Sequence, residues 1–125
     1  MNEFTYMVAA LVKKGSIIKE ELTEEQTHLL HMAVGVSGEA GELLDAIKRY
    51  AIYQKPLDMA NVIEELGDLE FYMEGLRTAL GITRNQCLEA NIIKLSKRYP
   101  DAVYTNRAAQ ARADKSLPGE KQNER

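Results

Sequence analysis

The chain has 125 residues, of which 28% are charged and 45% are hydrophobic. This composition is typical of one soluble domain that is large enough to bury a core. A single layer of helices of this length would bury only a marginal core by itself. The formal net charge of −3 argues against binding to nucleic acid polymers, because the field of the whole chain does not attract a polyanion. A single cysteine, Cys87, cannot form an intramolecular disulfide, which agrees with a reducing cytoplasmic location.

The N-terminal stretch predicts a short amphipathic helix from Asn2 to about Lys14, with Gly15 as its stop signal. Its apolar run is too short to span a bilayer, and no basic region precedes it. We therefore expect neither a signal peptide nor a membrane partner.

A second, much longer helix is expected from Glu24 to about Gln54. Thr23 and Gln26 have the spacing of a capping box, and Pro56 ends the helical pattern. The interior of this helix contains three glycines, each of which costs roughly 1 kcal/mol relative to alanine. We expect that close approach of another helix or of a ligand compensates this cost. The alternative is that the glycines kink the helix. These glycines are Gly35, Gly38 and Gly41.

Two further helices complete the expected set. Asp58 is the predicted cap of a helix that ends at Gly81, and its apolar residues recur every three or four positions. Thr83 begins another capping box, and the helix that follows ends before Pro100. The pattern lacks strand alternation and predicts an all-α, four-helix-bundle-like fold.

Beyond residue 106 the sequence offers little apolar material to bury. We expect one domain over residues 1–106 and a polar, flexible C-terminal tail over residues 107–125.

Two acidic pairs lie beside the apolar stripes of the two central helices. On a helical wheel Glu39 falls inside the apolar cluster of the second helix, with Glu42 at its edge, and Glu65 and Asp68 border the stripe of the third. An antiparallel hairpin that turns near Tyr53 brings the two pairs to the same height. Four converging carboxylates repel one another strongly in a partly buried site, so protonation or a cation must relieve them. Charged residues at this spacing usually form a solvated face, but the inward direction and mirrored spacing favour a site for Mg²⁺, with Mn²⁺ as a substitute.

Basic and polar residues that would contact a polyphosphate are predicted on the fourth helix. Asn91, Lys94 and Arg98 border its apolar stripe, and Lys48 and Arg49 lie one to two turns beyond Glu42. Lys94 is the favoured contact, because exposed lysines such as Lys48 more often serve solubility alone.

The motifs "GEAGELLDAIKR" and "EELGDLEFY" resemble the Glu-x-x-Glu and Glu-x-x-Asp signature of the MazG-like nucleotide pyrophosphohydrolases, in the all-α NTP pyrophosphatase superfamily. The flanking stretches "HMAVGVSGEAGEL" and "NIIKLSKRYPD" extend the resemblance over roughly residues 28 to 101.

The resemblance implies Mg²⁺-dependent hydrolysis of a (deoxy)nucleoside triphosphate to the monophosphate and pyrophosphate. It makes the four acids metal ligands, with Glu39 or Glu42 as the catalytic base. Asn91, Lys94 and Tyr99 become candidate substrate-phosphate contacts. It also implies a homodimer or homotetramer in which neighbouring subunits complete the bundle. The related phosphoribosyl-ATP pyrophosphohydrolases share the fold and suggest a second substrate.

Other chemistry-bearing side chains have simpler interpretations. Glu25 and His28 match half of a di-iron carboxylate motif, which normally occurs twice, so His28 and His31 are expected to be structural or to support the metal ligands. Cys87 has no histidine or acid at a suggestive spacing and is interpreted as an incidental thiol. Five aromatic residues are more often core than base-stacking partners. They are Phe4, Tyr6, Tyr50, Tyr53 and Tyr72.

Two alternatives from other functional classes stay open. A non-catalytic helical interaction module explains the amphipathic helices but not the inward acids. A redox di-iron protein explains the acids and His28, and iron-dependent absorbance would reveal it.

Overall fold

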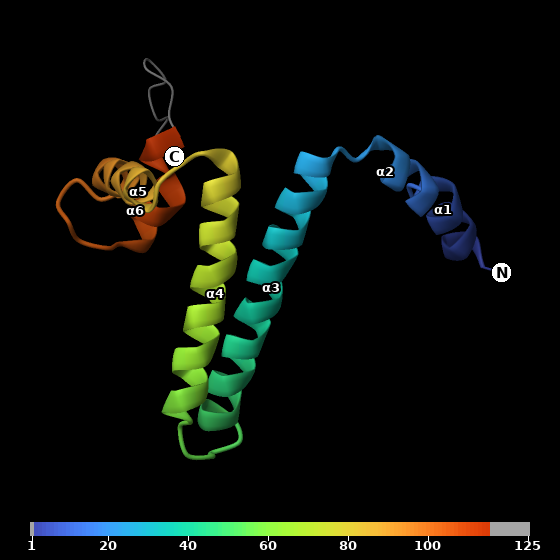
Figure 1. Ribbon diagram of the computed structural model, residues 1–125. Coiled ribbons are helices and arrows are strands. Elements are labelled where there is room, and N and C mark those ends of the chain that lie inside the picture. The colour runs from blue at the N-terminus through green and yellow to red at the C-terminus, as the bar shows by residue number, and fades with distance from the viewer. Residues whose placement is uncertain (1, 116–125) are drawn as a thin grey trace. The chain divides into compact units, whose positions relative to one another are not determined.

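The computed structural model describes residues 2–115. This part of the chain consists of helices joined by short loops and contains no strand, which confirms the all-α fold class (Figure 1). The chain divides into two compact units, Met1–Leu80 and Gly81–Arg125. The domain boundary expected after residue 106 lies within the second unit. No helix among residues 2–115 combines the length and the apolar character that crossing a membrane requires.

The first unit is built on a hairpin of two long helices, α3 (Glu24–Ala51) and α4 (Met59–Leu80). They run antiparallel and side by side along their length, joined by the loop of residues 52–58 (Figure 1). Both start signals act as the sequence predicts. Thr23 and Gln26 form a reciprocal capping box at α3, and the Asp58 carboxylate accepts a hydrogen bond from the Asn61 backbone N–H at α4. The helix predicted to reach Gln54 ends at Ala51 instead, because the chain turns at Gln54, whose φ is +54°.

The hairpin buries very little on its own. Met32 and Ala46 are the only buried hydrophobic residues in the described part of the chain, and both lie on α3. Arg77 is also buried, and its guanidinium donates hydrogen bonds to Glu74 and Glu70 on the same helix. Two helices in contact can cover only one stripe of each other. The remaining apolar side chains of the hairpin are therefore half-buried or exposed.

Two short helices, rather than one, precede the hairpin. The predicted helix ends at Leu11, as α1 (Glu3–Leu11), and a second helix, α2 (Gly15–Glu21), follows. Gly15, which the sequence pattern predicts as the end of the first helix, instead lies at the start of α2. Glycine occurs at both ends of helices, so Gly15 by itself does not show whether a helix ends or begins there.

The second unit contains α5 (Arg84–Arg98), which begins at the predicted capping box of Thr83 and Gln86. After a loop the chain forms α6 (Asn106–Ala111) and a 3₁₀ turn, η1 (Ala113–Lys115). The expected flexible tail starts at residue 107, yet its first part has regular structure. Residues 116–125 of that tail lie outside the described residues.

Candidate metal and nucleotide site

Three carboxylates converge at the middle of the hairpin. One oxygen atom each from Glu39 on α3 and from Glu65 and Asp68 on α4 lie within 4.8 Å of one another. Glu65 and Asp68 share a face of α4 because residues three apart are neighbours on a helix. Glu39 and Glu65 are half-buried, whereas Asp68 is exposed. The structure therefore brings together three of the four acids that the sequence analysis predicts as metal ligands.

Glu42, the fourth predicted ligand, lies outside this close group. Its side chain is exposed one turn beyond Glu39 on α3. Its negative charge still reaches the group, because it helps to raise the pKa of Glu65. Glu42 is thus a neighbour of the three-carboxylate group rather than a member of it.

The environment of Glu65 disfavours its ionised form. Partial burial raises the pKa of this carboxyl above its usual value, and a hydrogen bond with Glu39 and repulsion by Glu39, Glu42 and Glu64 add to the shift. A cation placed among these oxygens would replace the repulsion by attraction. The metal-free hairpin therefore carries an electrostatic cost that a divalent cation would remove.

The donor set fits a hard divalent cation. Carboxylate oxygens are the ligands that Mg²⁺ and Mn²⁺ prefer, and within residues 2–115 no histidine or cysteine joins the group. Three carboxylates also leave coordination positions for water and for substrate phosphate oxygens. These residues would hold Mg²⁺ or Mn²⁺ more readily than a metal that prefers imidazole or thiolate.

The histidines lie away from the acids. His28 precedes Glu39 by eleven positions on α3, about 16 Å along the helix axis. It lines a cavity of about 470 Å³ together with residues of both helices, namely Met32, Phe71, Glu74, Gly75 and Thr78. His31 instead makes an edge contact with the ring of Tyr72. Their placement agrees with the structural interpretation and gives no support to a di-iron centre.

Lys48, a predicted phosphate contact, already has partners at the end of α3. Its Nζ atom lies 3.4 Å from the Asp45 carboxylate and 5.4 Å from the centroid of the Tyr53 ring. Arg49 contacts the same carboxylate at 2.6 Å. The hydrogen bond with Asp45 raises the pKa of Lys48, which therefore stays charged. The sequence did not indicate that Asp45 pairs with both Lys48 and Arg49.

The predicted contacts on α5 differ sharply in their surroundings. Asn91 and Lys94 are exposed, and Lys94 makes no ion pair within the part of the chain that the structure describes. Arg98 is paired with Asp114 in η1 through two hydrogen bonds, of 2.9 Å from Nε and 3.2 Å from a terminal nitrogen. The Asp114 side chain is only 3% exposed. Arg98 thus holds the C-terminal segment against α5, a role that its position in the sequence does not reveal.

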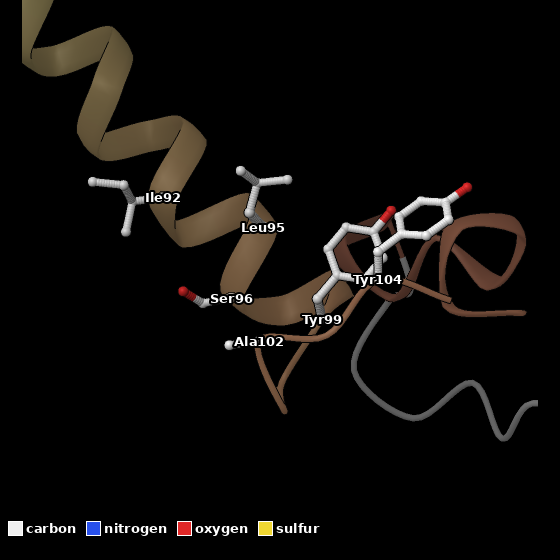
Figure 2. A pocket seen from close by; sticks show the side chains of 6 residues that line it. All are labelled: Ile92, Leu95, Ser96, Tyr99, Ala102 and Tyr104. Atoms are coloured by element: carbon white, nitrogen blue, oxygen red, sulfur yellow. The ribbon is translucent and has the colours of Figure 1, made fainter. Parts of the chain in front are cut away.

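Tyr99, the remaining predicted contact, lines an apolar cavity in the second unit. Figure 2 shows its ring beside that of Tyr104, with the ring centroids 5.6 Å apart. The cavity measures about 460 Å³, and its other walls come from α5 and the loop after it, namely Ile92, Leu95, Ser96 and Ala102. Four of the five aromatic residues that were expected to belong to the core are exposed at 50% or more. They are Phe4, Tyr6, Tyr50 and Tyr53, so the expectation that they belong to the core is wrong for the chain by itself.

Comparison with known proteins identifies the family. The family model described as the MazG nucleotide pyrophosphohydrolase domain matches residues 26–103. No curated protein and no solved structure matches the chain. The matched segment begins near the start of α3, contains both acidic motifs and ends just beyond α5. It covers well over half of the chain, which therefore belongs to the MazG family of nucleotide pyrophosphohydrolases.

Proposed function

We propose that this protein hydrolyses a (deoxy)nucleoside triphosphate to the monophosphate and pyrophosphate with the help of Mg²⁺. The observation that carries the proposal is the convergence of Glu39, Glu65 and Asp68 within 4.8 Å on facing helices. Family membership supports the general reaction class. The nucleotide and the metal are our own assignments.

We assign two roles among the four acids. Glu39, Glu65 and Asp68 would ligate the cation, because they are the three whose oxygens converge. A bound Mg²⁺ would polarise the α-phosphate, neutralise charge on the outer phosphates and lower the pKa of the attacking water. Glu42 lies one turn away, outside the close group, and is assigned as the base that takes the proton of this water.

The proposed hydrolysis forms one bond to phosphorus and breaks another. The water oxygen bonds to the α-phosphorus, and the bond between that phosphorus and the bridging oxygen breaks. The electron pair leaves with pyrophosphate, and the proton of the water passes to the Glu42 carboxylate. Positioning and electrostatic stabilisation supply most of the rate in reactions of this type.

We propose Asn91 and Lys94 as the principal phosphate contacts on α5. Both are exposed, and Lys94 has no competing ion pair among the described residues. Arg98 can contribute only if it exchanges the Asp114 carboxylate for a phosphate, and Tyr99 would contribute its ring or hydroxyl beside them. Lys48 is a weaker candidate, because its ammonium group is already paired with the Asp45 carboxylate.

We also propose that the protein forms a homodimer or homotetramer. The hairpin leaves large apolar side chains exposed on both helices, including Val34 at 59%, Leu44 at 67% and Ile63 at 64%. A second hairpin would cover such faces and complete a four-helix bundle. Light scattering after size-exclusion chromatography tests this assembly, and a strictly monomeric protein at micromolar concentration would contradict it.

The decisive experiment is product analysis on a panel of nucleotides with Mg²⁺. The panel contains the ribo- and deoxynucleoside triphosphates and phosphoribosyl-ATP, whose hydrolysis would indicate the second substrate class. We expect pyrophosphate and a monophosphate as products, and activity that chelation abolishes. Asp68→Asn should remove turnover, whereas Glu64→Gln, on the same helix but outside the close group, should retain it. A folded Asp68→Asn variant with unaltered turnover would refute the site. A Mg²⁺-dependent rise in thermal stability without turnover on any nucleotide would favour the non-catalytic interaction module.

A further inference from the structure

Two close contacts join the helices of the hairpin beside the acids. A Cβ atom added at Gly35 on α3 would lie 2.2 Å from Cδ1 and 2.4 Å from Cγ of Tyr72 on α4. The second contact has the opposite direction, since a Cβ atom at Gly75 on α4 would lie 2.6 Å from Sδ of Met32 on α3. Each helix thus provides one glycine and receives one large side chain. A side chain at Gly35 would overlap the ring of Tyr72, whereas one at Gly75 would displace the flexible end of the Met32 side chain.

These contacts lie in one register with the acids. Met32 faces Gly75 and Gly35 faces Tyr72, and the two residue numbers in each pair have the same sum as those of Glu39 and Asp68. Gly35 precedes Glu39 by four residues on α3, and Tyr72 follows Asp68 by four residues on α4. The second contact lies about one helical turn further from the acids. A single register therefore positions both contacts and the acidic group.

The register matters because a metal site tolerates little displacement. Mg²⁺ requires near-octahedral geometry with oxygen ligands at about 2.0–2.1 Å. Sliding one helix by a single turn, about 5.4 Å, would separate Glu39 from Glu65 and Asp68. In one direction the same movement would place the Tyr72 ring near His31 and Met32, and in the other near Gly38 and Glu39. Tyr72 lies against Gly35 only in the register that also makes the carboxylates converge.

The acids themselves do not maintain this arrangement. Ionised carboxylates whose oxygens lie within 4.8 Å of one another repel. The contact between Gly35 and Tyr72 lies about one helical turn from the acids and can oppose their separation. His31 and Phe71 make edge contacts with the Tyr72 ring and restrict its orientation.

We propose that the Gly35–Tyr72 and Met32–Gly75 contacts form a register lock, and that Gly35 and Tyr72 are positioning residues for the divalent-metal site. The inference rests on the proposed function, since it assigns these residues to the metal site proposed there. A purely structural role for the same contacts would lower the stability of the fold but leave the metal affinity of the folded protein unchanged.

The test compares alanine substitutions at three glycines of α3. Gly35→Ala introduces the overlap with Tyr72, whereas the controls Gly38→Ala and Gly41→Ala add a Cβ atom that meets nothing within 4 Å. Mn²⁺ is titrated into each folded, metal-free protein without nucleotide, and the free ion is measured by electron paramagnetic resonance. We expect Gly35→Ala to weaken Mn²⁺ binding about tenfold or more, as loss of supporting residues does at other metal sites. Both controls should bind within about twofold of the unmodified protein.

A compensating substitution separates positioning from stability. The double variant Gly35→Ala with Tyr72→Ala removes the ring that the new methyl group meets, and we expect it to bind Mn²⁺ more tightly than Gly35→Ala alone. If Gly35→Ala does not fold, Tyr72→Ala by itself provides the test, because it removes the contact without creating an overlap. It too should weaken Mn²⁺ binding.

Failure of the register lock and failure of the proposed metal site would give different results. Mn²⁺ affinity of folded Gly35→Ala or Tyr72→Ala equal to that of the unmodified protein, with only a lower melting temperature, would overturn the register lock. In that case Asp68→Asn would still abolish binding, and the proposed metal site would stand. If the unmodified protein binds no Mn²⁺, or if Asp68→Asn and the unmodified protein bind Mn²⁺ equally tightly, the proposed function also fails.

Discussion

Arg98 at the end of α5 donates hydrogen bonds from two nitrogens to the two carboxylate oxygens of Asp114, sixteen residues further along the chain. A carboxylate and a phosphate present similar oxygen acceptors to a guanidinium group. Asp114 therefore occupies the donors with which Arg98 would contact a substrate phosphate.

This pairing predicts a measurable effect of Asp114→Asn on substrate binding. If Arg98 contributes to phosphate binding, its release should lower the KM for the nucleotide by about threefold or more and leave kcat unchanged, because the binding-competent population rises. The melting temperature should fall, since the substitution also removes the partner that holds η1 against α5. Steady-state kinetics and thermal unfolding measure the two effects. An unchanged KM together with a lower melting temperature would make Arg98 purely structural.

The raised pKa of Glu65 predicts how the stability of the metal-free protein depends on pH. Because the folded-state pKa lies above the ordinary value of 4.5, the folded protein binds this proton more tightly than the unfolded chain does. The contribution is fully present below 4.5 and is lost as pH rises through the raised pKa. Urea unfolding in a chelator between about pH 4 and pH 7 should therefore show a stability loss that Glu65→Gln removes.

Mg²⁺ should reverse this dependence. A cation binds the ionised carboxylates, so its stabilising effect should grow as pH rises through the same window. Glu65→Gln should lose most of this effect. Equal stabilisation of both proteins by Mg²⁺ would mean that Glu65 is not a ligand.

The assignment of Glu42 as the base predicts that Glu42→Gln separates metal binding from catalysis. Mn²⁺ affinity should stay within about threefold of the unmodified value, because Glu42 lies outside the three converging acids. Turnover should fall by about a hundredfold or more, which is the usual contribution of a positioned base. Mn²⁺ titration and single-turnover kinetics check the two parts. Loss of Mn²⁺ binding as complete as that of Asp68→Asn would instead make Glu42 a ligand.

Packing between the helices predicts a difference between two similar substitutions. Ala46 is 6% exposed, whereas Ala40 on the same helix is exposed. Ala46→Leu should destabilise the protein by about 1–3 kcal/mol, because the added methyl groups have no space. Ala40→Leu should change the unfolding free energy by no more than about 0.5 kcal/mol. Urea denaturation measures both, and equal effects would contradict the described hairpin packing.

Much of the hairpin could be predicted from the sequence because its signals are local. Thr23 and Asp58 act through hydrogen bonds within one helical turn, and the spacing of Glu65 and Asp68 alone places both on one face. The mirrored positions of the acids predicted the register that the structure shows. Glu42 lies outside the group of three converging acids, and a position at the edge of a helical stripe does not determine where a flexible carboxylate points.

The remaining features depend on contacts between residues distant in sequence. The partnership of Arg98 with Asp114 requires the left-handed turn at Arg112, whose φ is +48°, and no motif in the chain signals it. The three glycines of α3 have the same local signal, yet only Gly35 meets a side chain from α4. The sequence predicts that some close approach compensates these glycines, but the choice among them depends on which one faces Tyr72.

Mn²⁺ titration of the metal-free protein, followed by electron paramagnetic resonance, determines whether Glu39, Glu65 and Asp68 together hold a divalent cation. We expect saturable binding by the unmodified protein and by Glu64→Gln, and loss of binding in Asp68→Asn. Equal Mn²⁺ binding by Asp68→Asn and the unmodified protein, or no binding by either, would contradict this expectation.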